Sequence, residues 1–287
     1  MSKNSTSEDR VGVALAAGAV LFLSTSPVFT RWASQSLSSY EITTWRLLLA
    51  GVVVLGLALI QKQSLPVRAD WLKFAGFGLI TALHFLFYNA SLEFTTIAHS
   101  LAIVYTAPIF VAIFSWLFLG EALTMRKWLG TLIVVAGVVV LAGMEPNLTR
   151  RMLWGDLLAL GCAITFGLYS VAGRSQRGTY RLFAYAGSVY FLAGLWMIPV
   201  TAFFFRPLGY TPVAIGSLVW LAVLPLAVGH TLYNAALRKT SATLVNLIAT
   251  QEITGGILLG IFLLGEIPSF SSVIGVIITL LGIGLLL

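Results

Sequence analysis

The chain has 287 residues, of which 59% are hydrophobic and only 9% are charged, and its mean hydropathy is +0.96. A soluble domain carries roughly a quarter charged residues, so this composition excludes a water-soluble protein, whose surface would here be mostly apolar. The net charge is +7, but the basic residues lie in short segments between apolar runs. That placement indicates membrane topology and contacts with lipid headgroups rather than nucleic acid.

Apolar runs follow one another along the chain, and about 20 apolar residues cross a hydrocarbon core of roughly 30 Å. The first half carries runs at 11–32, 41–60, 71–92, 96–119 and 127–144, and the second half carries runs at 154–173, 182–205, 213–236, 241–264 and 270–287. Turn residues and charges separate them at 61–66, 145–147, 174–181 and 206–209. The very short links 92–96 and 237–240 predict two antiparallel helical hairpins. Because the first run is full length and contains Pro27, we expect a retained helix rather than a cleaved signal peptide.

Lys and Arg are distributed unevenly between the two sides of the membrane. Side one, which holds the N-terminus, carries Lys3, Arg10, Lys62, Arg68, Lys73, Arg126, Lys127, Arg174, Arg177, Arg181, Arg238 and Lys239. Side two carries Arg150, Arg151 and Arg206, with Arg31 and Arg46 at helix ends that face it. Because cytoplasmic loops are enriched in Lys and Arg, side one and both chain termini are predicted to be cytoplasmic.

The chain repeats itself at an offset of 145 residues. Tyr88-Asn89-Ala90 aligns with Tyr233-Asn234-Ala235, and the same register carries Leu119-Gly120-Glu121 onto Leu264-Gly265-Glu266. Each half has five runs, an odd number, so the second half must enter the membrane from the opposite side. Inverted repeats of this kind are typical of secondary transporters. We therefore predict an all-α polytopic membrane protein with ten transmembrane helices in two inverted five-helix repeats, residues 1–145 and 146–287.

Glu252 lies near the middle of the ninth run, where a carboxylate costs on the order of 2.5–3.5 kcal/mol to insert. One interpretation is a proton-coupling group or a partner for a substrate amine. The other is a structural carboxyl that bonds a neighbouring helix. The sequence leaves both open.

Histidine and tyrosine side chains form a second group at membrane depth. His84 and Tyr88 share a face of the third run, Tyr105 lies on the fourth, and the eighth run carries His230 and Tyr233. Histidine can relay protons near neutral pH, or it can simply bond a backbone carbonyl between helices. The depth of His84 favours function, whereas His99, near side two, is interpreted as structural.

Ser24 and Ser26 flank a break in the first run, where Pro27 removes a backbone donor. Irregular backbone at that depth is tolerated where it faces protein or a cavity. A kinked helix that lines a substrate path and a proline bend repaired by hydroxyl groups both explain the pattern.

Deep aromatic residues complete the candidate cavity. Phe166 and Tyr169 on the sixth run are placed there with Phe85, and Asn246 on the ninth run is added as a polar candidate. Packing alone explains any single aromatic residue equally well.

Several catalytic and metal-binding patterns are absent from the sequence. There is no Gly-Lys-Ser/Thr phosphate loop and no His-Glu-x-x-His pair, and Asp9, Asp70 and Asp156 are all placed at interfaces. The single cysteine, Cys162, excludes an intramolecular disulfide. We expect no catalytic residues, no metal site, no cofactor and no enzymatic activity.

With these features the sequence resembles the drug/metabolite transporter superfamily, specifically its EamA-type ten-helix exporters, and is similar to YddG-like amino-acid exporters. The resemblance rests on Arg46-Leu47-Leu48-Leu49-Ala50 in the second run, on the Tyr-Asn-Ala-x-Leu ends of the third and eighth runs, and on the Leu-Gly-Glu ends of the fourth and ninth. That family usually shows a Glu-Pro pair in each half. Here the first half has Ala107-Pro108 and the second has Glu252-Ile253, which argues against a symmetric role for the pair.

The resemblance implies a basket of ten helices with a central cavity lined by the first, third, fourth, sixth, eighth and ninth spans. It also implies a secondary exporter in a bacterial inner membrane. Its substrates would be small metabolites, above all amino acids, including aromatic or other neutral ones. The expected partners are this small-molecule substrate and membrane lipids, with no nucleic acid and with a monomer as the simplest assembly.

Other functions stay in competition. An exporter of cationic drugs would use Glu252 to meet a positive charge. An exchanger of nucleotide sugars or phosphorylated metabolites would need Lys or Arg in the cavity, and none is predicted at mid-depth. The non-transport alternative is a membrane enzyme or scaffold. An intramembrane enzyme would need a nucleophile or paired acids at one depth, and a scaffold would not need Glu252 or His84 at depth.

Overall fold

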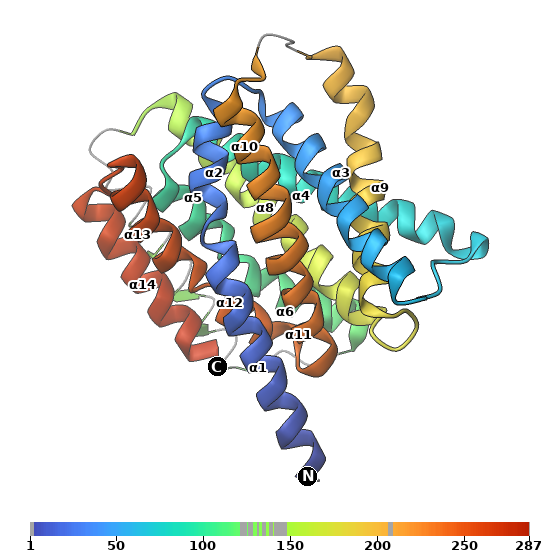
Figure 1. Cartoon of the computed structure of the whole chain (residues 1–287). Helices are drawn as coiled ribbons and strands as arrows, with labels where there is room; N and C mark the ends of the chain where they lie inside the picture. The colour runs from blue at the N-terminus through green and yellow to red at the C-terminus, as the bar shows by residue number, and fades with distance from the viewer. Residues whose placement is uncertain are drawn as a thin grey trace.

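The computed structural model describes residues 3–286 apart from 121–124, 126–128, 131, 134–135, 138–139, 141–147 and 206–208. Within these residues the chain forms helices and no strand, as the sequence predicts. The first and last helices both run to the lower end of the molecule in Figure 1, so the two termini share one side. The lower end is therefore side one, and the upper end is side two.

The first half contains a series of helices that run back and forth between the two ends. They are α1 (Lys3–Leu23), α2 (Ser26–Ser34), α3 (Ser39–Ile60), the short 3-10 helix η1 (Arg68–Asp70), α4 (Trp71–Phe94), α5 (Ile97–Val104) and α6 (Ala107–Leu119). The second half contains α8 (Arg150–Ser175), α9 (Leu182–Phe203), α10 (Pro212–Leu221), the π-helix η3 (Ala222–His230), α11 (Thr231–Lys239), α12 (Ala242–Ala249), α13 (Glu252–Leu264) and α14 (Phe270–Leu286).

Within the described part of the chain, eight helical stretches are long and apolar enough to cross a membrane. They are Asp9–Ser34, Ser39–Ile60, Arg68–Phe94, Ile97–Leu119, Arg150–Ser175, Leu182–Phe203, Pro212–Lys239 and Ala242–Leu264. They correspond to eight of the ten predicted spans, and α14, of 17 residues, corresponds to the tenth. The predicted fifth span, 127–144, lies largely outside the described residues, as do Glu121, Arg126, Lys127 and the turns at 145–147 and 206–208. The count of ten therefore stays a prediction.

Local signals set the helix ends. Ser38 starts α3 with a capping box, because its side chain accepts from the Glu41 N–H while the Glu41 side chain accepts from the Ser38 N–H. Gly120 ends α6 at φ +69° and Gly265 ends α13 at φ +66°. Glycine tolerates this left-handed conformation because it has no Cβ.

The two halves have helix breaks and hairpin turns at positions that are equivalent in the 145-residue register. The fourth span breaks at Tyr105 and Thr106, and the ninth breaks at Thr250 and Gln251, the equivalent positions. The first hairpin turn, at Thr95, lies at side two beside Arg31, whereas its counterpart at Thr240 lies at side one beside Asp9. The second hairpin is thus upside down relative to the first, as an inverted repeat requires.

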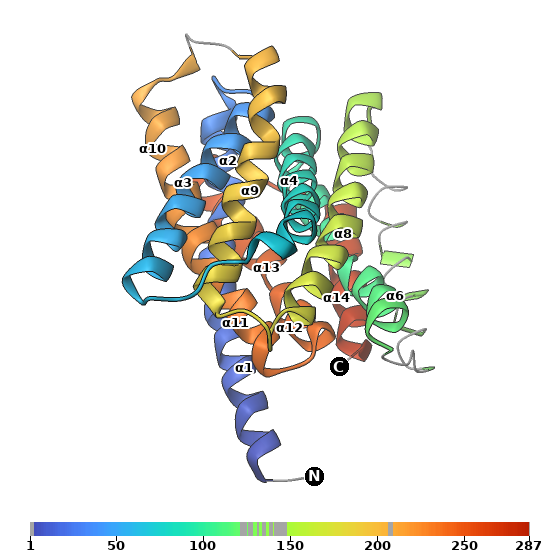
Figure 2. The same cartoon turned by 90° about the vertical axis from the view of Figure 1, so that its right-hand side faces the viewer.

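Glycines bring the two halves into close contact. α9 packs between α3 and α4 (Figure 2). A methyl group on Gly51 of α3 would lie 2.6 Å from the backbone nitrogen of Phe191 in α9, and one on Gly187 would lie 2.7 Å from the nitrogen of Leu55. These distances leave no room for a side chain, so the glycines set how closely the helices approach.

Candidate functional site

Among the described helices, three spans are interrupted near the centre of the molecule. The first breaks at Ser24 and Thr25, so that α2 begins at Ser26 with Pro27 in its first turn. The fourth breaks before α6, which has Pro108 in its first turn, and the ninth breaks before α13, which begins at Glu252. Proline cannot donate the backbone hydrogen bond that would continue the preceding helix. Interrupted helices of this kind form binding sites in transporters.

A small pocket lies where these interruptions meet. It is lined by Leu23, Ser26, His84, Phe85, Tyr88, Val104, Tyr105, Phe166, His230 and Glu252. Its volume of about 20 Å³ suits a single water molecule. The structure therefore shows a closed conformation, in which a metabolite would need the pocket to widen.

The Glu252 carboxylate is the acidic group of this pocket, and its residue is only 5% exposed. It accepts a hydrogen bond from the Tyr105 hydroxyl and a longer one, 3.5 Å, from the Tyr88 hydroxyl. As the first residue of α13, it also lies at the positive end of that helix dipole. The two phenols join the first half to the second through one carboxylate.

Arg46 corrects a prediction made from the sequence. The sequence places it at a helix end facing side two, but its side chain is fully buried. Its Nη1 donates to Oδ1 of Asn89 at 3.1 Å and its Nη2 to Oγ of Ser26 at 3.4 Å, while the guanidinium lies 4.5 Å from the ring centre of Phe85. Arg46 is seven residues into α3, about 10 Å from the helix start. A cation therefore does lie at the depth of the pocket.

Arg46 and Glu252 are opposite charges that do not pair. Among the described residues no ion pair joins them, and the Nε of Arg46 has no hydrogen-bond partner. Ser26 and Phe85 contact the guanidinium and also line the pocket. The cation thus lies directly behind the wall of a pocket that contains the carboxylate.

The two deep histidines both line the pocket, and their rings meet edge to face with centres 6.1 Å apart. His84 stacks on Phe166 at 4.8 Å, and its Nδ1 lies 3.3 Å from the Cys162 carbonyl oxygen. His230 ends the π-helix η3, and its Nδ1 has no hydrogen-bond partner among the described residues. π-helical turns are frequent at functional sites.

Four predicted site residues lie outside the pocket wall. The hydroxyl of Ser24 donates to Val20 O at 2.8 Å within its own helix. The other three form a buried layer nearer side one: Tyr169, Tyr233 and Asn246. The Tyr233 hydroxyl contacts Oγ of Ser170 at 2.7 Å and accepts a hydrogen bond from Asn246. The Tyr169 hydroxyl accepts a hydrogen bond from Asn234. Of the predicted set, Ser26, His84, Tyr88, Tyr105, Phe166, His230 and Glu252 do line the pocket.

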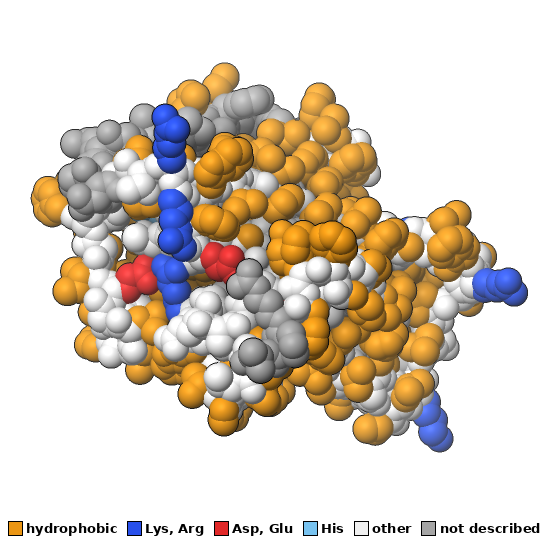
Figure 3. Space-filling view, turned by 90° about the horizontal axis from the view of Figure 1, so that it is seen from above, with side chains coloured by type: hydrophobic (Ala, Val, Ile, Leu, Met, Phe, Trp, Pro, Cys, Tyr) orange, Lys and Arg blue, Asp and Glu red, His pale blue; other side chains and the backbone are white. Residues whose placement is uncertain are grey.

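Each end of the molecule holds a wider vestibule. The side-two vestibule, of about 960 Å³, is lined by charged residues that include Arg31, Glu93, Arg151 and Glu266. Seen from this end, basic side chains form a row flanked by acidic ones inside a hydrophobic rim (Figure 3). The side-one vestibule, of about 590 Å³, is lined by Asp9, Arg174, Arg177, Arg238, Lys239, Thr240, Ser241 and Leu244.

His99 and Asp156 differ from their predicted environments. Asp156 lies toward side two but is 9% exposed, and it accepts from the Thr95 hydroxyl at 3.0 Å. Its other oxygen lies 3.4 Å from Nδ1 of the fully buried His99. His99 therefore faces a carboxylate rather than only backbone. Within the described part of the chain, no group of His, Cys, Asp and Glu could hold a metal ion.

Comparison with known proteins places the chain among membrane transporters. It is 24% identical over 262 residues to an uncharacterized transporter of Archaeoglobus fulgidus, covering 89% of this chain and 90% of the relative. It is 23% identical to the uncharacterized transporter YwfM of Bacillus subtilis, covering 92% and 90%. A probable sugar phosphate/phosphate translocator of Arabidopsis thaliana is 29% identical over 124 residues, covering 43% of this chain and 39% of that protein.

The fold is also known from experiment. A protein crystal structure superimposes with a TM-score of 0.72 at 19% identity, covering 96% of this chain and 95% of that one. The sequence pattern of the EamA-like transporter family matches twice, over residues 10–143 and 153–287, one match in each predicted repeat. The chain therefore belongs to the EamA-like transporter family, and its activity is the transport of small molecules rather than catalysis.

Proposed function

We propose that the chain is a secondary exporter of amino acids that works by alternating access about the central pocket. Side one, with its excess of Lys and Arg and with both termini, would face the cytoplasm of a bacterial cell. The two inverted halves would rock so that the pocket opens first to side one and then to side two. A monomer contains all residues of the pocket.

The unpaired charges Arg46 and Glu252 carry this proposal. A buried charge without a counter-ion is strongly destabilising, yet here two of opposite sign lie beside one pocket and stay apart. An amino acid carries a carboxylate and an ammonium group on one carbon. Placed between them, it would neutralise both, with its carboxylate toward Arg46 and its ammonium toward Glu252. The surrounding Phe85, Phe166 and Tyr105 rings would pack against an apolar or aromatic side chain.

A transport assay with matched compounds tests the proposal. Purified protein in liposomes is offered phenylalanine, 3-phenylpropionate, which lacks the amine, and phenethylamine, which lacks the carboxylate. We expect phenylalanine alone to exchange rapidly. Arg46→Gln should reduce recognition of the carboxylate, and Glu252→Gln that of the amine. If none of the twenty amino acids moves, the amino-acid proposal is wrong.

A second candidate is exchange of phosphorylated metabolites. It gains support from the buried Arg46, which removes the sequence-based objection that no cation lies at mid-depth, and from the basic side-one vestibule, which would attract anions. The partial likeness to a sugar phosphate translocator points the same way. Glu252 in the pocket counts against it, because that carboxylate would repel a phosphate. Export of cationic drugs would use Glu252 but leave Arg46 without a partner.

A further inference from the structure

The hairpin turn between α4 and α5 is held from both halves of the chain at side two. The hydroxyl of Thr95, in this turn, donates a hydrogen bond to Oδ1 of Asp156 in α8, with 3.0 Å between the two oxygens. Beside Asp156, Gly155 packs so tightly that a methyl group there would lie 2.7 Å from Cβ and 2.8 Å from the backbone nitrogen of Thr95. The first helix of the second half therefore presses directly on the turn of the first half.

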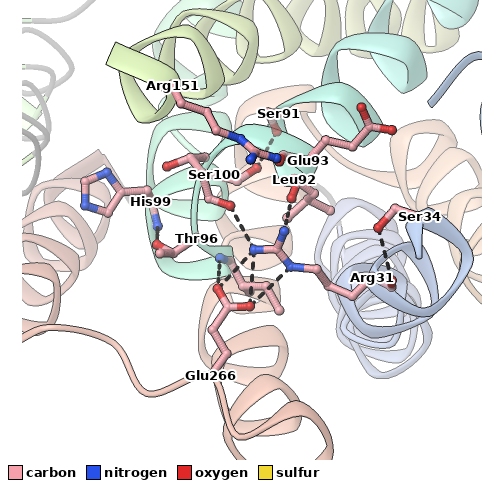
Figure 4. Close-up of polar contacts among 12 residues, drawn as sticks. Arg31, Ser34, Ser91, Leu92, Glu93, Thr96, His99, Ser100, Arg151 and Glu266 are labelled. Atoms are coloured by element: carbon pink, nitrogen blue, oxygen red, sulfur yellow. Dashed lines mark hydrogen bonds and ion pairs between the residues drawn. The ribbon is translucent and has the colours of Figure 1, made fainter. Parts of the chain in front are cut away.

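A carboxylate from α13 holds the same turn from another direction. Glu266, just beyond α13, accepts from the Ile97 N–H at 2.5 Å and from Nε and Nη2 of Arg31, each at 3.2 Å. Arg31 in turn donates to the carbonyl oxygens of Thr95, at 2.8 Å, and Leu92. Figure 4 shows Arg31 reaching from α2 to the carboxylate of Glu266 beneath the start of α5. The carboxylate lies at the α5 N-terminus, where a negative charge is favoured.

An inverted counterpart of this arrangement lies at side one. Thr240, the equivalent of Thr95, lies in the turn between α11 and α12. A methyl group on Gly12 of α1 would lie 2.8 Å from its Cγ2. Arg174 of α8 donates to the carbonyl oxygens of Thr240, at 2.5 Å, and Leu237, at 3.2 Å, as Arg31 does with Thr95 and Leu92. The first helix of the first half presses here on the turn of the second half.

We propose that these two contacts are the two gates of the transporter. The side-two clamp consists of Thr95, Gly155, Asp156, Arg31 and Glu266, and the side-one clamp of Thr240, Gly12 and Arg174. Each joins the two halves at one end of the central pocket. Both clamps are closed in this structure, which explains why the pocket holds only about 20 Å³. Opening one clamp while the other stays closed would give the pocket access to a single side.

The two clamps differ in chemistry. Gly12 and Gly155 are related by an offset of 143 residues, as are Arg31 and Arg174, and in that register Asp156 corresponds to Val13. In the 145-residue register of the hairpins, His99 corresponds to Leu244. The side-two clamp therefore has a buried carboxylate and histidine that have apolar counterparts at side one. Separating the side-two clamp must break a carboxylate–hydroxyl hydrogen bond, so substitutions of Asp156 should act on side-two opening alone.

A pair of glycine substitutions tests the gates directly. Gly155→Ala and Gly12→Ala each add one methyl group at a mirrored contact, so each is the control for the other. The reporter is Val104→Cys, in the buried pocket wall, in a Cys162→Ser background that removes the native cysteine. A membrane-impermeant maleimide is added to proteoliposomes from one side at a time, with the protein orientation known.

Gly155→Ala should raise the labelling rate from side two about tenfold, the shift expected when a methyl group overpacks a closed contact, with no rise from side one. Gly12→Ala should do the reverse. Should Gly155→Ala not fold, Glu266→Gln is measured instead, with the same expected rise from side two. Equal labelling from both sides, or no change in any variant, would overturn the assignment. The inference rests on the proposed alternating access, but labelling needs no substrate, so a wrong amino-acid assignment would leave this result unaffected.

Discussion

Replacing Glu252 by glutamine is the sharpest test of the central site. Glutamine keeps the shape of the side chain and one acceptor oxygen, so Tyr105 still has a partner and we expect the substrate-free fold to be retained. The substitution removes the charge that would meet a substrate ammonium group. Hydrogen bonds to charged groups contribute about 1.5–3 kcal/mol, and each 1.4 kcal/mol is about tenfold in affinity. The Kd for an amino acid should therefore rise about 10- to 100-fold.

The measurement is the Tm of detergent-solubilised protein across a titration of phenylalanine, because a ligand that binds only the folded state stabilises it by RT ln(1 + [L]/Kd). Tyr105→Phe serves as the control, since it removes one donor to the same carboxylate but keeps the ring and the charge. We expect its Kd to change less than tenfold. An unchanged Kd and flux in Glu252→Gln would refute the role in substrate binding. A large loss of Tm without substrate would instead show that the carboxylate is structural.

Three further substitutions, one with a matched control, test other parts of the structure. Gly51→Ala should lower the free energy of unfolding by about 1–3 kcal/mol, because its methyl group would meet the backbone of Phe191 in α9. The control is Gly56→Ala, in open space on the same helix, which should be neutral or slightly stabilising. Equal Tm values for the two variants would contradict this packing. Ser38→Ala should cost about 1 kcal/mol through the lost helix cap, seen as a lower Tm with transport retained. Tyr233→Phe should leave the substrate Kd unchanged, because its hydroxyl bonds outside the pocket; a weaker Kd would place this layer in the binding site.

The membrane fold could be predicted because its signals are local and repeated. The apolar runs predict the membrane spans, and the 145-residue repeat predicts the division into two halves without any knowledge of tertiary contacts. The same register locates the helix breaks at Tyr105 and Thr250 and the terminal glycines Gly120 and Gly265. Short motifs at equal offsets report backbone geometry reliably, because the turns and caps they form depend on nearby residues.

The detailed site could not be predicted as well, because a position in an apolar run gives neither the exact depth of a side chain nor the direction in which it points. Tyr169 and Tyr233 each lie three residues beyond a pocket residue, which shifts them about 4.5 Å toward side one. For Arg46 the direction of the side chain decides. Its position near a helix start indicates an interface, but its long side chain turns inward to Asn89 and Ser26. Only tertiary contacts reveal that direction.

The two halves have the same helix arrangement but carry different residues at the pocket, and this difference suits an asymmetric substrate. The clamps retain glycine, threonine and arginine at mirrored positions, because both ends must close in the same way. At the pocket, by contrast, the first half starts α6 with Ala107 and Pro108 whereas the second starts α13 with Glu252. Arg46 comes from α3, whereas α9, its counterpart, carries no charged residue. A two-fold frame thus presents a cation from one half and a carboxylate from the other, and a molecule with both charges would bind in one orientation only.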